Sequence, residues 1–315
     1  MPELDPQTRS ESTTRPTLYI AGPTASGKTG VSVELALRYP GAEIINADAY
    51  QAYDALPTLT ARPVEHEHRG VPHHLFGTIP VADSLDAQRH ADLARAAIRD
   101  VQSRGGWPIV VGGSGLYVKA MTYGLSVPGS DPELRAELAK LTPDQLVDRL
   151  VQVDPEGAAA TNLKNPRYVI RNLEICLASG KSLAEARAAT AISEPFEPFR
   201  GVFLRWPRDE LYDRINARTV AMFDAGVVEE VAAIPKDRFG ITAERMIGLR
   251  EIWAMLAGDA DRETTIAAIQ QATRRYAKRQ GTWFRREEDD FNPVEVSPED
   301  RAEEVADRIE SLLDN

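Results

Sequence analysis

Apolar residues in the first 124 positions alternate between short continuous runs and helix-like spacing. The run TLYIA at 17–21 ends at a glycine-rich turn, and the segment GVSVELALRY at 30–39 then repeats apolar residues at helical intervals. Two more continuous runs, at 42–48 and 107–113, flank a helix predicted over 86–104. Strands that alternate with helices in this way predict βαβ units and a parallel sheet.

The pattern changes between residues 130 and 191, where helix-like segments follow one another with no strand between them. The run GVFLRWP at 201–207 then predicts a strand that returns to the sheet, and helical segments follow it as far as Trp283. We therefore expect an α/β fold with a parallel sheet and a mostly helical insertion domain. The expected parts are a disordered tail at 1–15, a core at 16–124 and 200–290, the insertion at 125–199, and an acidic C-terminal helix at 291–315.

The composition is that of an ordinary globular protein, with 315 residues of which 43% are hydrophobic and 27% are charged. Cys176 is the only cysteine, which excludes disulfides within the chain and zinc sites made of thiolates. No apolar run approaches the roughly 20 residues that a membrane span needs. The polar N-terminal segment has neither a signal-peptide nor a transit-peptide pattern, so a cytoplasmic protein without membrane association is expected.

A glycine-rich loop follows the first predicted strand and opens the first predicted helix. Its sequence GPTASGKT fits the P-loop pattern G-x-x-x-x-G-K-[ST]. Successive backbone N–H groups and the helix N-terminus favour a bound phosphate there. Lys28 adds a positive charge, and Thr29 offers a hydroxyl to Mg²⁺. Nucleotides and prenyl diphosphates both fit this prediction, whose residues are Gly22, Pro23, Thr24, Ala25, Ser26, Gly27, Lys28 and Thr29.

Two further polar turns end predicted strands on the P-loop side of the sheet. Asp48 ends the second strand, and open α/β sheets bind ligands at the carboxyl ends of their strands. Asp48 is therefore a candidate general base or metal ligand, with an ordinary helix cap as the alternative. The turn GGSGLY at 112–117 lets the backbone approach a ligand and places Ser114 there, although it also fits a simple tight connection.

A basic segment at 273–286 contrasts with the formal net charge of −11. The segment TRRYAKRQGTWFRR contains six cationic residues, no acidic residue, and three interleaved aromatic residues. Arg274 and Lys278 lie four residues apart and form one stripe of a helix. The segment predicts a binding site for a polyanion, with aromatic rings that can stack on bases. The alternative is a solvated helix face that pairs with the acidic tail.

Taken together in their order along the chain, these motifs resemble the tRNA dimethylallyltransferase (tRNA isopentenyltransferase) family. The resemblance runs from about Leu18 to Arg286. The matching blocks are GPTASGKT at 22–29, DAYQAY at 48–53, TARP at 60–63, PHHL at 72–75, GGSGLY at 112–117, DPELR at 131–135, RNLEICLASGK at 171–181, RINAR at 214–218, MIGLRE at 246–251 and TRRYAKRQGTWFR at 273–285.

The resemblance implies a P-loop NTPase-like core and a transfer reaction. The dimethylallyl group of dimethylallyl diphosphate would move to N6 of adenosine 37, next to the anticodon, in tRNAs that read codons beginning with U. Thr24, Lys28, Thr29 and Arg218 match positions that bind the diphosphate with Mg²⁺, and Asp48 matches the residue that accepts a proton from the adenine amine. The implied catalytic residues are Asp48, Thr24 and Arg218, and the implied partner is a tRNA anticodon stem-loop bound by a monomer.

The resemblance also assigns residues to tRNA contacts, and the basic segment adds Arg274 and Lys278. The assigned residues are Asp48, Ala49, Tyr50, Gln51, Ser114, Arg135, Arg167, Tyr168, Val169, Ile170, Arg171, Arg245, Met246, Ile247, Gly248, Leu249 and Arg250. This chain departs from the family at 53–63, where Ala55, Pro57 and Leu59 replace glycine, aspartate and glycine. Three rival functions are a prenyltransferase acting on free adenine nucleotides, a small-molecule kinase, and a non-catalytic RNA binder.

Overall fold

The computed structural model describes residues 15–125, 131–189, 194–287 and 289–314. The predicted disordered tail therefore lies almost entirely outside the described residues. By its internal contacts the chain divides into two compact units, of which the second is formed by Tyr123–Phe196. The first unit combines the segments before and after it. None of the helices in the described ranges has the length and apolar character needed to cross a membrane.

The first unit is built on a six-stranded sheet with the order β3-β2-β4-β1-β5-β6, in which every pairing is parallel. Ile20 of the central strand pairs with Val111 on one side and with Val202 on the other. The parallel sheet predicted from the sequence is thus confirmed. The strands are β1 Thr17–Ala21, β2 Ala42–Asn46, β3 His73–His74, β4 Trp107–Gly112, β5 Phe199–Arg205 and β6 Phe291–Glu295.

Strand β6 differs from the sequence prediction, which placed 291–315 in an acidic C-terminal helix. Phe291 and Val294 are buried, and the strand pairs with β5 along its whole length. Its signal in the sequence is weak because only two of its five residues are apolar and its partner strand lies about 90 positions earlier. The C-terminal helix itself is present as α15, Ala302–Leu313.

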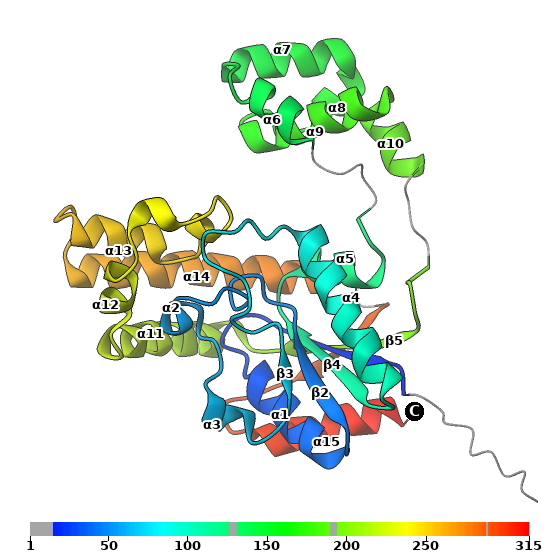
Figure 1. The fold of residues 1–315 in the computed structure, drawn as a ribbon, viewed down its shortest axis with the longest axis vertical. Helices are drawn as coiled ribbons and strands as arrows, with labels where there is room; N and C mark the ends of the chain where they lie inside the picture. Colours follow the sequence, from blue (N-terminus) through cyan, green and yellow to red (C-terminus); the bar gives the residue numbers. More distant parts are fainter. Residues whose placement is uncertain (1–14, 126–130, 190–193, 288, 315) are drawn as a thin grey trace, which may run out of the picture. The chain divides into compact units, whose positions relative to one another are not determined.

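Helices cover both faces of the sheet (Figure 1). Helix α1, Lys28–Arg38, and helix α15 pack side by side on one face, against a core formed by alternate strand residues such as Leu18 and Ile109. Helix α4, Ala87–Ser103, packs on β2 and β4 and contacts α5, Gly115–Thr122. This layering leaves the loops after the strands at the carboxyl edge of the sheet, where α/β proteins bind ligands.

A second apolar core lies beyond that edge and supports the loops. Helix α11, Arg208–Asp224, packs along helix α14, Arg262–Phe284, which carries the basic segment (Figure 1). The remaining elements of this region are α2 Pro57–Thr60, α3 Glu65–His68, α12 Val227–Ala232, η1 Lys236–Arg238, η2 Ala243–Arg245 and α13 Leu249–Leu256.

The second unit is helical throughout its described residues. Each of its first four helices begins with proline after a residue whose side chain caps the helix, namely Asp131, Thr142, Asp154 and Asn165. The helices enclose a small apolar core that includes Leu150 and Leu173. The predicted helical insertion is confirmed, with the helices α6 Pro132–Leu138, α7 Pro143–Val153, α8 Pro155–Ala159, α9 Pro166–Ser179 and α10 Leu183–Ala189.

Candidate functional site

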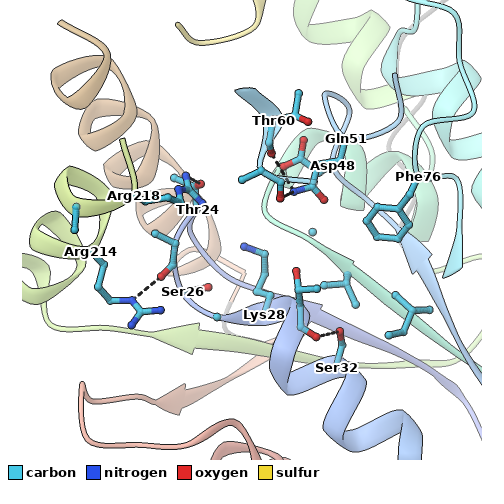
Figure 2. A pocket seen from close by; sticks show the side chains of 18 residues that line it. Thr24, Ser26, Lys28, Ser32, Asp48, Gln51, Thr60, Phe76, Arg214 and Arg218 are labelled. Atoms are coloured by element: carbon cyan, nitrogen blue, oxygen red, sulfur yellow. Dashed lines mark hydrogen bonds between the residues drawn. The ribbon is translucent and has the colours of Figure 1, made fainter. Parts of the chain in front are cut away.

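A cavity of about 480 Å³ lies at the carboxyl edge of the sheet, over the P-loop (Figure 2). Its walls come from the P-loop and the start of α1, from β2 and the segment after it, from the end of β4, from Phe76 after β3, and from helix α11. The charged side chains among the described lining residues are three cations and one anion, namely Lys28, Arg214, Arg218 and Asp48. In a chain with a net charge of −11, this local excess of positive charge indicates an anion site.

The P-loop has the backbone shape that a phosphate cradle requires. Gly22 has no room for a side chain, because a Cβ there would lie 2.7 Å from the Ser26 hydroxyl oxygen. Ala25 and Gly27 have positive φ angles of 67° and 84°, so the loop turns tightly before α1 begins at Lys28. The Ser26 hydroxyl is buried and has no hydrogen-bond partner among the described residues. An orphaned buried hydroxyl in the cavity wall is suited to a ligand oxygen.

Asp48 is held in place by the end of strand β2. The buried Asn46 side chain accepts a hydrogen bond from the Asp48 backbone N–H at 2.7 Å and donates to the Asp48 and Leu75 carbonyl oxygens at 2.9 Å each. The Asp48 carboxylate accepts a hydrogen bond from the Tyr50 N–H at 3.0 Å. The carboxylate is partly exposed and lines the cavity across from Lys28 (Figure 2).

Two cations face Asp48 from the other side of the cavity. Arg218 donates a hydrogen bond to the Thr24 hydroxyl at 2.6 Å, and Lys28 donates to the Pro23 carbonyl oxygen at 2.8 Å. Burial lowers the pKa of Lys28 to about 8, although the Asp48 charge opposes that shift. Burial also lowers the pKa of Arg218, again opposed by Asp48. The charge of one carboxylate therefore acts on the pKa of both cations. All three charged groups belong to the same site.

Gln280 of α14 is a site residue that the sequence analysis missed. Its buried amide accepts a hydrogen bond from the Thr24 N–H at 2.9 Å and donates to the Gly113 carbonyl oxygen at 2.9 Å. It thus joins the P-loop to the turn after β4. Its place in the family-like block at 273–285 was the available signal, but a glutamine inside a basic helix has the sequence pattern of a polar surface residue.

A second, smaller cavity of about 60 Å³ adjoins the first. The two cavities share Thr24, Asp48, Thr60 and Arg218 in their walls. The rest of the second cavity is lined by five apolar side chains and by Tyr50, Thr219, Thr273 and Tyr276. The pKa of Tyr276 is raised by burial and by the nearby Asp48 charge. The anion site and a partly apolar chamber therefore meet at the Asp48 carboxylate. The apolar lining residues are Leu59, Met222, Met246, Ile247 and Ile269.

The departures from the family at 53–63 are accommodated locally. The Glu230 carboxylate of α12 accepts hydrogen bonds from the N–H groups of Thr58 and Leu59, at 2.8 and 2.9 Å. It caps the helix α2 that begins at Pro57, where the family has an aspartate. Leu59 is buried and forms part of the second cavity, in a place where the family has glycine. The loop thus keeps an ordered shape with different residues.

Several residues predicted to contact RNA lie around the second cavity. The Tyr50 hydroxyl donates to the Arg245 carbonyl oxygen at 2.9 Å, which brings the segment 245–250 next to Asp48. Met246 and Ile247 line that cavity, whereas Gln51 lines the first one.

Ser114 lies at the start of helix α5, where its carbonyl oxygen accepts hydrogen bonds from the N–H groups of Tyr117 and Val118. Arg245 and Arg250 are exposed, Gly248 caps α13 with a φ of 98°, and Ala49 and Leu249 are buried.

Other residues predicted to contact RNA lie in the helical insertion. Arg135 forms a two-pronged ion pair with the buried Glu174, at 2.5 and 2.6 Å, and Arg171 also pairs with Glu174 at 3.2 Å. Arg167 and Tyr168 are exposed. Val169 lies in the apolar core of the unit, and Ile170 packs against it. Helical periodicity therefore turns part of the assigned stretch inward, which a block of sequence letters does not reveal.

The basic segment does not form one uniform surface. The Arg274 guanidinium donates to the Asn216 side-chain oxygen of α11 at 2.5 Å. Lys278 lines a separate cavity of about 180 Å³ between the start of α11 and α14, together with Arg208 and Arg285. Arg275 and Arg279 are exposed on the outer side of α14. Within the basic segment, Arg274 thus contacts α11, whereas Arg275 and Arg279 face solvent.

The oxygen donors at the P-loop fit a divalent cation. Among the described residues, no group of three or more histidine, cysteine, aspartate and glutamate side chains forms a metal cage. Magnesium in phosphate-binding sites does not need such a cage, because it takes substrate phosphate oxygens, water and one or two protein oxygens. Thr29, Asp48 and the unpartnered hydroxyl of Ser26 all line the cavity and supply oxygens of that type.

Comparison with known proteins identifies the family. The family model described as IPP transferase matches residues 51–287, about three quarters of the chain. The chain belongs to the IPP transferase family. The family resemblance seen in the ordered motifs is thereby confirmed.

Curated relatives extend the similarity of this IPP transferase to almost the whole chain. A tRNA dimethylallyltransferase of Akkermansia muciniphila is 43% identical over 294 residues, which cover 93% of this chain and 98% of the relative. A tRNA dimethylallyltransferase of Anaeromyxobacter dehalogenans is also 43% identical, with the same coverage of both chains. The chain is thus an enzyme of the prenyltransferase class, as these relatives are.

Solved IPP transferase structures share the fold. The tRNA isopentenylpyrophosphate transferase of Bacillus halodurans superposes with a TM-score of 0.68 at 32% identity, covering 95% of this chain and 97% of its own. A eukaryotic dimethylallyltransferase acting on tRNA gives a TM-score of 0.76 at 26% identity, covering 90% and 74%. The predicted α/β fold with a P-loop NTPase-like core and a helical insertion is therefore confirmed.

Proposed function

We propose that this chain transfers the dimethylallyl group of dimethylallyl diphosphate to N6 of adenosine 37 in tRNAs that read codons beginning with U. The observation that carries the proposal is the junction of the two cavities. The cationic P-loop cavity and the apolar chamber share Thr24, Arg218 and the Asp48 carboxylate. A donor bound with its diphosphate in the first cavity therefore exposes its allylic carbon next to a carboxylate.

The first task of such a site is to stabilise the leaving group. As the bond between C1 and the bridging oxygen breaks, negative charge builds on the diphosphate. Lys28 and Arg218 line the cavity and are held there by hydrogen bonds to the Pro23 carbonyl oxygen and the Thr24 hydroxyl, so they are in place to stabilise that charge. Thr24 holds Arg218 through its hydroxyl, so its role is both to bind the diphosphate and to orient the arginine.

The second task is to make the adenine amine nucleophilic. Its lone pair is delocalised into the ring, so loss of a proton during bond formation helps the attack. The N6–C1 bond forms as the C1–O bond breaks, and the N6 proton moves to the Asp48 carboxylate. A placed base typically contributes about 10²–10⁴-fold to the rate. Asn46 holds the Asp48 backbone, and the Tyr50 N–H holds its carboxylate, at the cavity junction where both substrates meet.

A divalent cation, for which we propose Mg²⁺, fits beside the P-loop. The residue that would hold it is Thr29, which lines the cavity at the start of α1. When bound, it supplies positive charge that neutralises the phosphate oxygens. The apolar lining of the second cavity, including Leu59 and Ile269, keeps water away from the reacting carbon.

The test of this function is direct labelling. Purified protein is incubated with radiolabelled dimethylallyl diphosphate, Mg²⁺ and an anticodon stem-loop carrying adenine at position 37, without ATP. We expect label in the stem-loop and none in a stem-loop with guanine at that position. Label in free AMP but not in RNA would support a prenyltransferase acting on nucleotides, and dependence on ATP would support a kinase.

Lys28 gives a pH prediction for donor binding. Its charged form binds the diphosphate, and burial lowers its pKa to about 8 in the free protein. Affinity for diphosphate is therefore expected to fall by about twofold between pH 7 and pH 8 and more steeply at higher pH, by at most about tenfold per pH unit. Calorimetric titration between pH 7 and 9.5 measures it. Lys28→Arg keeps its charge and should show no such fall. Identical pH profiles of diphosphate affinity in this variant and in the unmodified protein would contradict the role of Lys28.

Gln280→Leu tests the link between the P-loop and the turn after β4. It leaves the Thr24 N–H and the Gly113 carbonyl oxygen without partners, which costs about 1–3 kcal/mol of unfolding free energy for each buried group. We also expect a raised KM for dimethylallyl diphosphate, because the loop loses its support. Gln270→Leu on the same helix removes a hydrogen bond to the Asn216 carbonyl oxygen away from the cavity and should leave KM unchanged.

The basic segment gives a prediction for RNA binding. Replacing Arg274 and Lys278 together by alanine should weaken stem-loop binding and reduce its salt dependence by about one logarithmic unit per lost phosphate contact. Fluorescence anisotropy at several salt concentrations measures both effects. Lys236→Ala, which removes an exposed lysine stacked on Trp253, is the matched control. An unchanged salt slope in the double variant would place the RNA elsewhere.

A further inference from the structure

Arg214 is a cation of the P-loop cavity that neither the motifs nor the family resemblance assigns to a role. It lies four residues before Arg218 on α11, so the two side chains project from the same face of the helix. Both line the cavity over the P-loop (Figure 2). Whereas Arg218 is largely enclosed, Arg214 is exposed at the open side of the cavity.

Two contacts fix the Arg214 side chain in spite of its exposure. Its Nε donates a hydrogen bond to the Ala25 carbonyl oxygen at 2.9 Å, and its guanidinium lies 4.6 Å from the centre of the Trp206 ring. Trp206 itself donates from Nε1 to the Ser26 carbonyl oxygen at 3.0 Å. The guanidinium is therefore attached to the outer turn of the P-loop at a fixed place.

These contacts leave the outer end of the guanidinium available. Among the described residues, neither terminal nitrogen of Arg214 has a hydrogen-bond or ion-pair partner. The Arg214 charge also contributes to the lowered pKa of Arg218, after burial, so the two cations repel each other across the cavity. With only the Asp48 carboxylate to oppose three cations, the charges in the cavity wall are unbalanced until an anion binds.

We propose that Arg214 is a third cationic ligand of the diphosphate. Its terminal nitrogens bind phosphate oxygens at the open side of the cavity, while Lys28 and Arg218 bind from within. The planar guanidinium can donate two parallel hydrogen bonds to two oxygens of one phosphate, whereas a lysine ammonium cannot bind in this bidentate way. This inference rests on the proposed function for the identity of the donor, but the ligand it concerns is the diphosphate group alone.

The alternative role is mechanical, because Arg214 also braces the strained turn at Ala25, whose φ is 67°. Arg214→Gln separates the two roles. Glutamine can still donate a hydrogen bond to the Ala25 carbonyl oxygen, but it has no charge. A bracing role would leave diphosphate affinity nearly intact in this variant. A ligand role would lower it, and Arg214→Met, which keeps only the contact with Trp206, would lower it as well.

The experiment is calorimetric titration of the full-length protein with inorganic diphosphate and Mg²⁺. We expect Arg214→Gln to weaken binding by at least about tenfold, as for the loss of one charge-assisted hydrogen bond. Arg208→Gln, an exposed arginine one and a half turns earlier on α11, should bind as the unmodified protein does. Normal affinity in Arg214→Gln would overturn the inference. If that variant does not fold, Arg214→Met carries the same expectation.

The failure of this inference is distinguishable from failure of the proposed function. If the unmodified protein binds diphosphate with the predicted dependence on Arg214 but does not prenylate the stem-loop, the function is wrong and the Arg214 site stands. If the stem-loop is prenylated and Arg214→Gln binds diphosphate normally and keeps a normal KM for dimethylallyl diphosphate, the function stands and the Arg214 site is wrong.

Discussion

Asp48→Asn is expected to lower kcat for prenylation of a stem-loop by about 10²–10⁴-fold. Asparagine keeps the oxygen that accepts the Tyr50 N–H, so the loop after β2 keeps its shape. It cannot accept the proton that N6 loses. Because a base acts only in the transition state, the substrates should still bind. Single-turnover kinetics with saturating stem-loop and donor measures the chemical step.

The direction in which Asp48→Asn changes the affinity for diphosphate gives an independent check of the role of Asp48. The Asp48 charge raises the pKa of both Lys28 and Arg218, which means that it attracts the same cations as the diphosphate does. Removing that charge should leave diphosphate affinity unchanged or slightly higher. Asp54→Asn is the matched control, since its carboxylate accepts a backbone N–H from Val81 in an exposed place. Near-normal turnover in Asp48→Asn would remove Asp48 as the base.

Arg218→Gln is expected to lower kcat by about 10²–10³-fold, as is typical for loss of one preorganised group that stabilises developing charge. The guanidinium is enclosed, donates to the Thr24 hydroxyl and faces Asp48 across the cavity junction. Its interaction with the diphosphate should strengthen as the C1–O bond breaks. Arg218→Gln should therefore lower kcat by a larger factor than it lowers the affinity for dimethylallyl diphosphate. Arg214→Gln, by contrast, is predicted to lower the affinity for diphosphate.

A second substitution tests whether Thr24 acts through Arg218. Thr24→Val removes the hydroxyl that accepts the Arg218 hydrogen bond. If Thr24 mainly orients Arg218, the double variant should be little worse than Arg218→Gln alone, because coupled residues are not additive. Arg262→Gln, which breaks an exposed ion pair with Asp224, should leave kcat unchanged. Additive losses would show that Thr24 acts on the diphosphate by itself.

The fold could be predicted from the sequence where the signal is local. The strands β1 and β4 are largely apolar runs that end at glycine-rich turns, and β2 has an apolar centre in the segment AEIIN. Their alternation with helices specifies a parallel sheet. Strands β3 and β6 carried no such signal. β3 has two residues, and β6 contains exposed polar residues and a proline, so each is a strand only because a distant strand supplies its hydrogen bonds.

The residues predicted to contact RNA show the same difference between what the local sequence indicates and what the fold decides. Contiguous stretches were assigned on sequence blocks, and the structure separates them by helix face. Leu249 and Val169 are core residues, whereas Arg250 and Tyr168 next to them are exposed. The spacing of 3.6 residues per turn decides which neighbour faces outward, and the packing partner decides which face is the outer one.

By itself, the sequence determined the chemistry of this protein. The phosphate loop is specified by two glycines and a lysine at fixed spacing, because its shape depends on backbone angles within eight residues. Asp48 is placed by the end of its own strand. Only the tertiary structure decided that Gln280 supports the P-loop, that Arg214 completes its ring of cations, and that the two cavities meet at Asp48. The contacts of Gln280 with Thr24 and of Arg214 with Ala25 join residues that lie 256 and 189 positions apart. Contacts of that kind depend on how helices pack on the sheet, and no local pattern of residues encodes them.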